Sequence, residues 1–280
     1  MPRQRDGWLF MRLLRGWPGR GAFGYHWAMR EELEILASGM FSAEQIVLTY
    51  TEHHAPPPDA LSRIEARWAQ YMHAACHEGR TLFNSPVAYL KSVSAAGGIL
   101  NLELGPTDYK TFLVTTLRDQ DWFQRHSPAA ITPALGNSIL LTHGDTAYLG
   151  VRSKAVAAYP HWAHLFGGVL DWPAQRGGDA DVLLEHLYRE LDEELGIGTS
   201  YLAAPPRVLA VMRDPLLAQP ELVWHGQLKE PLPMHHNALN PGEHDGILAI
   251  AMTEQIVGGP PMTPVSKQAI ARAMRRGGNS

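Results

Sequence analysis

The strongest helical pattern in the sequence runs from Asp181 to Gly196, and its last turns hold an unusual density of carboxylates. Asp181 is suited to cap the N-terminus of this helix, and Gly196 is suited to end it. An apolar stripe at helical spacing is formed by Val182, Leu183, Leu187, Leu191 and Leu195. Strand-like segments come before and after the helix, so the stripe is expected to pack on a sheet.

The rest of the chain alternates between the two periodicities. Strand-like patterns occupy 85–94, 99–104, 138–142, 147–153, 164–170, 207–212, 221–228 and 247–252, and helical patterns occupy 60–78, 108–123 and 264–276. This alternation is typical of a mixed α/β layer. We predict three regions: a basic, poorly ordered segment over 1–40, an α+β region over 41–133 that contributes substrate recognition, and an α/β core over 134–280.

Composition narrows the classes of protein. The 280 residues are 45% hydrophobic and 19% charged, which is ordinary globular composition, and the net charge of −4 argues against a nucleic-acid surface. No apolar run reaches the length of a membrane span, so no membrane association is expected. The single cysteine, Cys76, excludes an internal disulfide and favours a reducing compartment, which makes a cytoplasmic location the expectation. The oligomeric state stays open.

Three carboxylates share one face of the central helix. Glu190, Glu193 and Glu194 stand at positions i, i+3 and i+4, where they repel one another unless a cation lies between them. Oxygen ligands at this density favour Mg²⁺, with Mn²⁺ as the alternative, over zinc. Arg189 lies four residues before Glu193 and can neutralise or orient one of the acids. The competing interpretation is a solvated acidic face with an internal ion pair.

The run Arg189–Ile197 resembles the second half of the Nudix box, R-E-U-x-E-E-x-G-U with U a bulky aliphatic residue, at every fixed position. The first half departs, because the Glu and Gly positions of the box hold Asp181 and Gln175. Gly167-Gly168 resembles the Gly-Gly turn of the family, displaced upstream by an insertion of about seven residues within 172–179. The resemblance implies a Nudix fold, an α/β/α sandwich with a mixed sheet, here with an N-terminal α+β extension.

The resemblance also implies an activity and a set of site residues. Nudix enzymes hydrolyse a nucleoside diphosphate linked to another group, with divalent cations. By this likeness Glu190, Glu193, Glu194 and Gly168 would hold the metal, and Arg189 would orient the acids. Glu190 is also a candidate for the general base. A further acid is expected in the loop before 247–252, where Glu243 is the first candidate and Asp245 the second; the alternative for this loop is a polar turn.

A narrower likeness concerns the substrate. The segments 82–90 and 104–113, followed by Leu135-Gly136, resemble animal Nudix enzymes that cleave UDP-glucose and UDP-galactose. This implies a small nucleotide-sugar substrate that yields UMP and a sugar 1-phosphate, with Asn84, Tyr109 and Lys110 as candidate contacts. Alternatives are a local turn role for Asn84 and a core role for Tyr109.

Two other functions remain open. One is a Nudix hydrolase of ADP-ribose, a dinucleotide or coenzyme A. The other is a nucleotide-binding sensor without turnover, against which the intact set of Arg189 and the three glutamates argues.

Overall fold

The computed structural model describes residues 33–52, 55–77, 79, 82–154, 156, 158–173, 180–232, 243–252 and 261–277. All of them belong to one compact unit, Leu33–Ser280. Residues 1–32, which make up most of the predicted basic segment, lie outside the described residues. So do residues 174–179, which make up most of the predicted insertion. No helix within the described part of the chain is long and apolar enough to cross a membrane.

The centre of the fold is an eight-stranded sheet with the order β1-β9-β10-β5-β6-β11, in which β8 also pairs with β5 and β7 with β6. Its strands are β1 (Glu34–Phe41), β5 (Gly136–His143), β6 (Thr146–Arg152), β7 (Ala163–His164), β8 (Phe166–Val169), β9 (Arg207–Arg213), β10 (Pro220–Gln227) and β11 (His244–Ala251). β5 and β10 run parallel, whereas β5 and β6 run antiparallel, so the sheet is mixed as predicted.

A second, three-stranded sheet with the order β2-β4-β3 is formed by the part of the chain between β1 and β5. It consists of β2 (Ile46–Tyr50), β3 (Pro86–Ala96) and β4 (Ile99–Asp108), and the helical segments around it are α2 (Pro58–His77), α3 (Tyr109–Phe112), the π-helical turns Leu113–Arg118 and α4 (Gln120–His126). These elements match the predicted N-terminal α+β extension. β3 is attached to the core by a backbone hydrogen bond of 2.8 Å from Ala88 N to the oxygen of Leu170.

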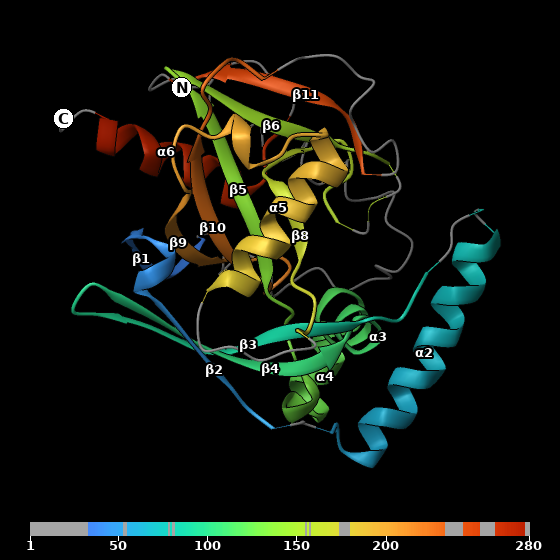
Figure 1. The fold of residues 1–280 in the computed structure, drawn as a ribbon. Helices are drawn as coiled ribbons and strands as arrows, with labels where there is room; N and C mark the ends of the chain where they lie inside the picture. Colours follow the sequence, from blue (N-terminus) through green and yellow to red (C-terminus); the bar gives the residue numbers. More distant parts are fainter. Residues whose placement is uncertain are drawn as a thin grey trace, which may run out of the picture. The chain divides into compact units, whose positions relative to one another are not determined.

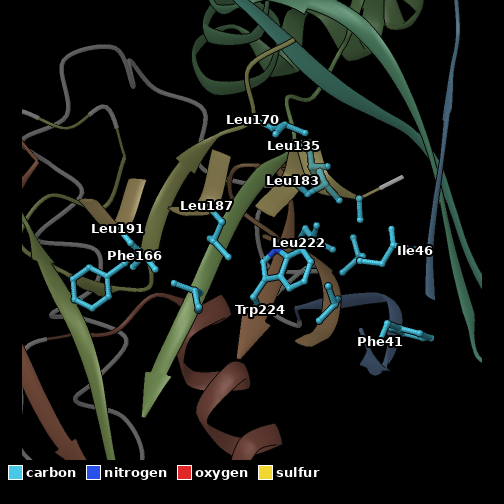
Figure 2. Packing of buried hydrophobic residues seen from close by; sticks show 14 of the residues in the cluster. Phe41, Ile46, Leu135, Phe166, Leu170, Leu183, Leu187, Leu191, Leu222 and Trp224 are labelled. Atoms are coloured by element: carbon cyan, nitrogen blue, oxygen red, sulfur yellow. The ribbon is translucent and has the colours of Figure 1, made fainter. Parts of the chain in front are cut away.

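Helices cover both faces of the larger sheet (Figure 1). On one face lies α5 (Asp181–Leu195), whose leucines pack beside Leu222 and Trp224 (Figure 2). On the other face α6 (Pro264–Gly277) contacts β9, β10 and β5. Burying an apolar helix stripe on each face gives the three layers, which confirms the predicted α/β/α fold class.

Two strands were missed by the sequence patterns. β1 pairs with β9 in the larger sheet, although the segment 1–40 is expected from sequence to be poorly ordered. Its burial is irregular, since only Ala37 and Phe41 are buried, so the period-2 alternation that marks a strand is weak there. β2 was missed as well. It is held by parallel pairing to β4, a long-range contact that local sequence does not encode.

The ends of α5 agree in part with the prediction. Gly196 ends the helix with a φ of 64°, the left-handed conformation that favours glycine. The N-cap is Ala180 rather than Asp181, which is the first helical residue. A carboxylate in the first turn still interacts favourably with the helix dipole.

One buried amide fixes α5 to the sheet. Asn137 on β5 is fully buried; its Nδ2 donates to the carbonyl of Leu183 at 2.8 Å, and its Oδ1 accepts from Trp224 Nε1 at 2.7 Å. The amide therefore satisfies a helix carbonyl and an indole N–H that have no access to water.

Replacing this amide should destabilise the fold. Asn137→Ala leaves the buried Trp224 N–H without its acceptor and removes the side-chain donor to the Leu183 carbonyl, and we expect the free energy of unfolding to fall by about 1–3 kcal/mol. Urea unfolding measures the change, with the exposed Asn101→Ala on β4 as the control at about 0.5 kcal/mol or less. Equal unfolding midpoints for the two variants would contradict this role of Asn137.

Candidate metal centre

The C-terminal turns of α5 meet the Gly-Gly segment of β8. The backbone N–H of Gly167 donates to Oε2 of Glu194 at 2.9 Å. Gly167 has a φ of 129°, and a Cβ at this position would lie 2.3 Å from the carbonyl oxygen of Asn137. Only glycine fits here, and its conformation aims the N–H at the carboxylate.

Gly168 leaves room for a second carboxylate. A Cβ on Gly168 would lie 2.7 Å from Oε2 of Glu190. The missing side chain thus lets the Glu190 carboxylate approach the strand backbone. The structure brings together Gly168, Glu190 and Glu194, which the sequence predicted as members of one site.

Glu243, just before β11, and His244, its first residue, also contribute side chains to the site. The side-chain ligand atoms of Glu194, Glu243 and His244 all lie within 4.8 Å of one another. Glu243 is exposed, whereas the side chains of Glu194 and His244 are 2% and 4% exposed. The second sequence candidate, Asp245, lies instead 3.5 Å from Nδ1 of His161 in an exposed pair. We refer to Glu190, Glu194, Glu243 and His244 as the carboxylate–histidine cluster.

Two carboxyl groups of the cluster, those of Glu190 and Glu194, have raised pKa values. Burial raises the pKa of Glu190 to about 7, and the neighbouring carboxylates of Glu194 and Glu243 add to the increase. Burial, followed by Glu243, also raises the pKa of Glu194 well above its usual range. A divalent cation beside these oxygens would favour their ionised forms. The charge, the oxygen donors and the buried imidazole therefore fit such an ion.

Arg189 holds the outer carboxylates. Its guanidinium lies 2.6 Å from Oδ2 of Asp171, 3.5 Å from Oε1 of Glu190 and 3.7 Å from Oε1 of Glu193. This agrees with the orienting role implied by the resemblance. The Glu193 side chain is 58% exposed, so of the three glutamates it is the one that faces solvent.

Three residues near the cluster were not singled out from sequence. Nε2 of His186 contacts the carbonyl of Val169 at 3.0 Å and lies 3.5 Å from Oε1 of Glu190. Its position four residues before Glu190 is the one signal that could have identified it. His244 was overlooked beside Glu243, and burial together with the Arg152 charge lowers its pKa to about 4.

Arg152, at the end of β6, is the third missed residue. Burial lowers the pKa of its guanidinium, while the carboxylates of Glu221, Glu194 and Glu243 act in the opposite direction. Arg152 is therefore a buried positive charge that partly compensates the acids of the cluster. No sequence signal identifies it, because β6 and the loop before β11 meet only in the folded sheet.

The predicted substrate residues lie together at the start of α3. Asn84 accepts a 2.8 Å hydrogen bond from the backbone N–H of Lys110 and donates to Asp108 at 3.2 Å. The Lys110 amine pairs with Glu65. Tyr109 packs in the apolar cluster that includes Val169, the residue after Gly168. Asn84 thus fixes the start of α3, and Tyr109 borders the same apolar cluster as Val169.

Comparisons with known proteins were made by sequence and by structure. No protein-family model and no curated protein matches the chain. The MutT Nudix hydrolase from Burkholderia pseudomallei is 19% identical, with a TM-score of 0.37 over 50% of this chain and 98% of that one. The Nudix domain of Shewanella oneidensis NrtR, complexed with ADP-ribose, is 15% identical, with a TM-score of 0.39 over 56% and 97%.

An ADP-ribose pyrophosphatase from Streptococcus suis is 13% identical, with a TM-score of 0.32 over 51% of this chain and 93% of that one. At such low TM-scores the functional interpretation depends on the residues of the site.

The close approach of Gly168 to Glu190 can be tested directly. Gly168→Ala adds a methyl group where the carboxylate lies, and we expect Mn²⁺ affinity to fall by roughly ten-fold or more because a ligand is displaced. The control is Gly198→Ala, where an added Cβ has no atom within 4 Å. Titration followed by the electron paramagnetic resonance signal of free Mn²⁺ measures both variants. Unchanged affinity in Gly168→Ala would exclude Glu190 from the metal centre.

Proposed function

We propose that this chain is a Nudix-type pyrophosphohydrolase that uses a divalent cation to hydrolyse the diphosphate of a nucleoside diphosphate linked to a second group. The observation that carries the proposal is the meeting of Glu190 and Glu194, both from the box-like helix, with the Gly-Gly strand and with Glu243. Three separate elements, β8, α5 and the residue before β11, thus bring together the groups that could hold the cation.

The chemistry follows from the charge on a diphosphate, whose oxygens repel an incoming nucleophile. A bound divalent cation neutralises that charge, orients the diphosphate and lowers the pKa of a water ligand. Glu194 and Glu243 would hold the ion, with Glu190 and the Gly168 carbonyl beside them. Arg189 keeps Glu190 and Glu193 in position through its three carboxylate contacts. Water adds to one phosphorus and the anhydride P–O bond breaks, which leaves two phosphate monoesters.

The proposed substrate is a nucleotide sugar, with UDP-glucose or UDP-galactose giving UMP and the sugar 1-phosphate. The metal centre recognises only the diphosphate, which all these substrates share, so discrimination must come from other residues. The likeness to UDP-sugar hydrolases covers 82–90 and 104–113, which include the start of β3, the end of β4 and all of α3. Tyr109 and Val169 border the same apolar cluster, which supports a role of this region near the Gly-Gly strand.

Removing one charge from the cluster should abolish most of the activity. We expect Glu194→Gln to lower turnover of the substrate by roughly 100-fold or more, because a metal ligand is lost. Glu193→Gln should also reduce turnover strongly, because the family resemblance implies that this solvent-facing carboxylate holds a metal as well. The control is Glu185→Gln on the exposed side of the same helix, which should match wild type. Release of phosphate monoesters at saturating Mg²⁺ or Mn²⁺ measures all three variants.

A second readout separates catalysis from folding. Glutamine at position 194 can still accept the Gly167 N–H, and it removes a buried charge, so the metal-free variant should unfold no earlier than wild type. Wild-type turnover by Glu194→Gln would remove the catalytic assignment. A large loss of metal-free stability would instead show that the carboxylate is structural.

Base and sugar selectivity need a panel of substrates: UDP-glucose, UDP-galactose, ADP-glucose, GDP-mannose and ADP-ribose. We expect kcat/KM to be highest for the uridine substrates, and Asn84→Ala to reduce that preference because it removes the acceptor of the Lys110 backbone N–H at the start of α3. Turnover of the poorest substrates should stay unchanged in the variant. A flat profile across bases, or preference for ADP-ribose, would contradict the UDP-sugar assignment, and no turnover of any compound would favour a sensor.

A further inference from the structure

His244 is a buried imidazole without a hydrogen-bond partner. Its side chain is 4% exposed, and neither Nδ1 nor Nε2 has a hydrogen-bond partner among the described residues. Nε2 lies 3.2 Å from Oε1 of Glu194, close to that oxygen but outside hydrogen-bonding geometry. Buried polar atoms in folded proteins are almost always paired, so two bare ring nitrogens at an acidic cluster indicate a missing partner.

The ring is held in place by packing rather than by polar contacts. It stands edge-on to Phe166, with ring centroids 5.6 Å apart and an interplanar angle of 73°. Phe166 lies on β8. On β6, Gly150 leaves space for the ring, since a Cβ there would lie 2.4 Å from the imidazole. Two neighbouring strands thus fix the orientation of Nε2 towards Glu194, as expected for a preorganised ligand.

A simple ion pair between His244 and Glu194 does not explain this arrangement, because Nε2 and Oε1 lie outside hydrogen-bonding geometry and Nδ1 has no partner among the described residues either. On the neighbouring strand, the residue opposite His244 is Arg152. A cation placed between the nitrogen and the oxygen does explain the arrangement. Adjacent ligands of an octahedral ion bound at about 2.0–2.1 Å are separated by about 3.0 Å, close to the 3.2 Å between Nε2 and Oε1.

We propose that His244 is a nitrogen ligand of the metal centre, together with Glu194 and Glu243, and that it shifts the preference of this centre from Mg²⁺ towards Mn²⁺. The proposal rests on the divalent cation of the proposed function. Mg²⁺ favours oxygen ligands, whereas binding to sites that contain nitrogen strengthens along the first transition series.

His186, the second histidine that the described part of the chain brings near the cluster, is already engaged. Nε2 of His186 contacts the carbonyl of Val169 at 3.0 Å, and its Nδ1 lies 3.4 Å from Nδ2 of Asn137. His186 therefore serves as part of the scaffold. We expect His244 to coordinate the ion directly and His186 not to do so.

Electron spin echo modulation of the Mn²⁺-loaded protein tests the ligand directly. We expect nitrogen modulation from a coordinated imidazole in wild type, its change on labelling the histidines with ¹⁵N, and its loss in His244→Gln. The control is His225→Gln on β10, whose ring contacts Thr142 and which should keep the modulation. Titrations should show Mn²⁺ affinity falling by roughly ten-fold or more in His244→Gln, with a smaller loss for Mg²⁺.

The outcomes separate this proposal from the proposed function. Mn²⁺ bound without histidine nitrogen modulation in wild type would overturn the ligand assignment, even if the protein hydrolyses nucleotide sugars. Modulation that persists in His244→Gln would overturn it as well. If the variant does not fold, the ¹⁵N-labelled wild type still decides whether a histidine nitrogen binds the ion, and His186→Gln, which should keep the modulation, tests the alternative ligand. A histidine-ligated Mn²⁺ without hydrolysis of any nucleoside diphosphate compound would retain the ligand and refute the enzyme.

Discussion

The site depends on the close approach of a helix that carries carboxylates to a strand that has no side chains at the point of contact. Gly167 donates its N–H to Glu194, and Gly168 leaves the space that Glu190 occupies. Any larger residue at either position would collide with the sheet or with a carboxylate. The rest of the site is built around this contact: Asn137 fixes α5 to β5 and β10, and Arg189 fixes the outer acids.

Burying several acids together is electrostatically unfavourable, and nearby positive charges offset this only in part. Arg152 supplies one buried positive charge, and Arg189 supplies another at the surface of the cluster. The carboxyl groups of Glu190 and Glu194 nevertheless have raised pKa values, because burial and mutual repulsion outweigh the two arginines. Under the two proposals a divalent cation would compensate this charge, and the imidazole of His244, which has no hydrogen-bond partner among the described residues, would complete its donor set.

The two sheets suggest how recognition and chemistry are divided. The larger sheet and α5 carry the acids, which can recognise only a diphosphate. The smaller sheet is attached through Ala88 to Leu170, which follows the Gly-Gly strand. Under the proposed function, the neighbouring helix α3 would contact the remainder of the substrate. Under the proposed function, substrate range would therefore change through α3 and the loops around it, without change to the metal centre.

The sequence by itself determined the elements whose signals are local. The leucine stripe, the Gly196 stop and the spacing of Glu190, Glu193 and Glu194 defined α5 and the acid-bearing face, and most strands were visible from alternation. Glu243 was predicted from the family resemblance, which leads one to expect a late acid, and from its place in a polar loop before a strand. β1 was missed because its burial pattern is irregular, and β2 because it depends on pairing with β4.

Only the tertiary structure decided which acids are buried, since Glu194 and Glu193 are neighbours in sequence but differ from 2% to 58% in exposure. It also brought Arg152 and His244 to the cluster. Their contribution arises from strand pairing and desolvation, which act between residues far apart in the chain and leave no local pattern.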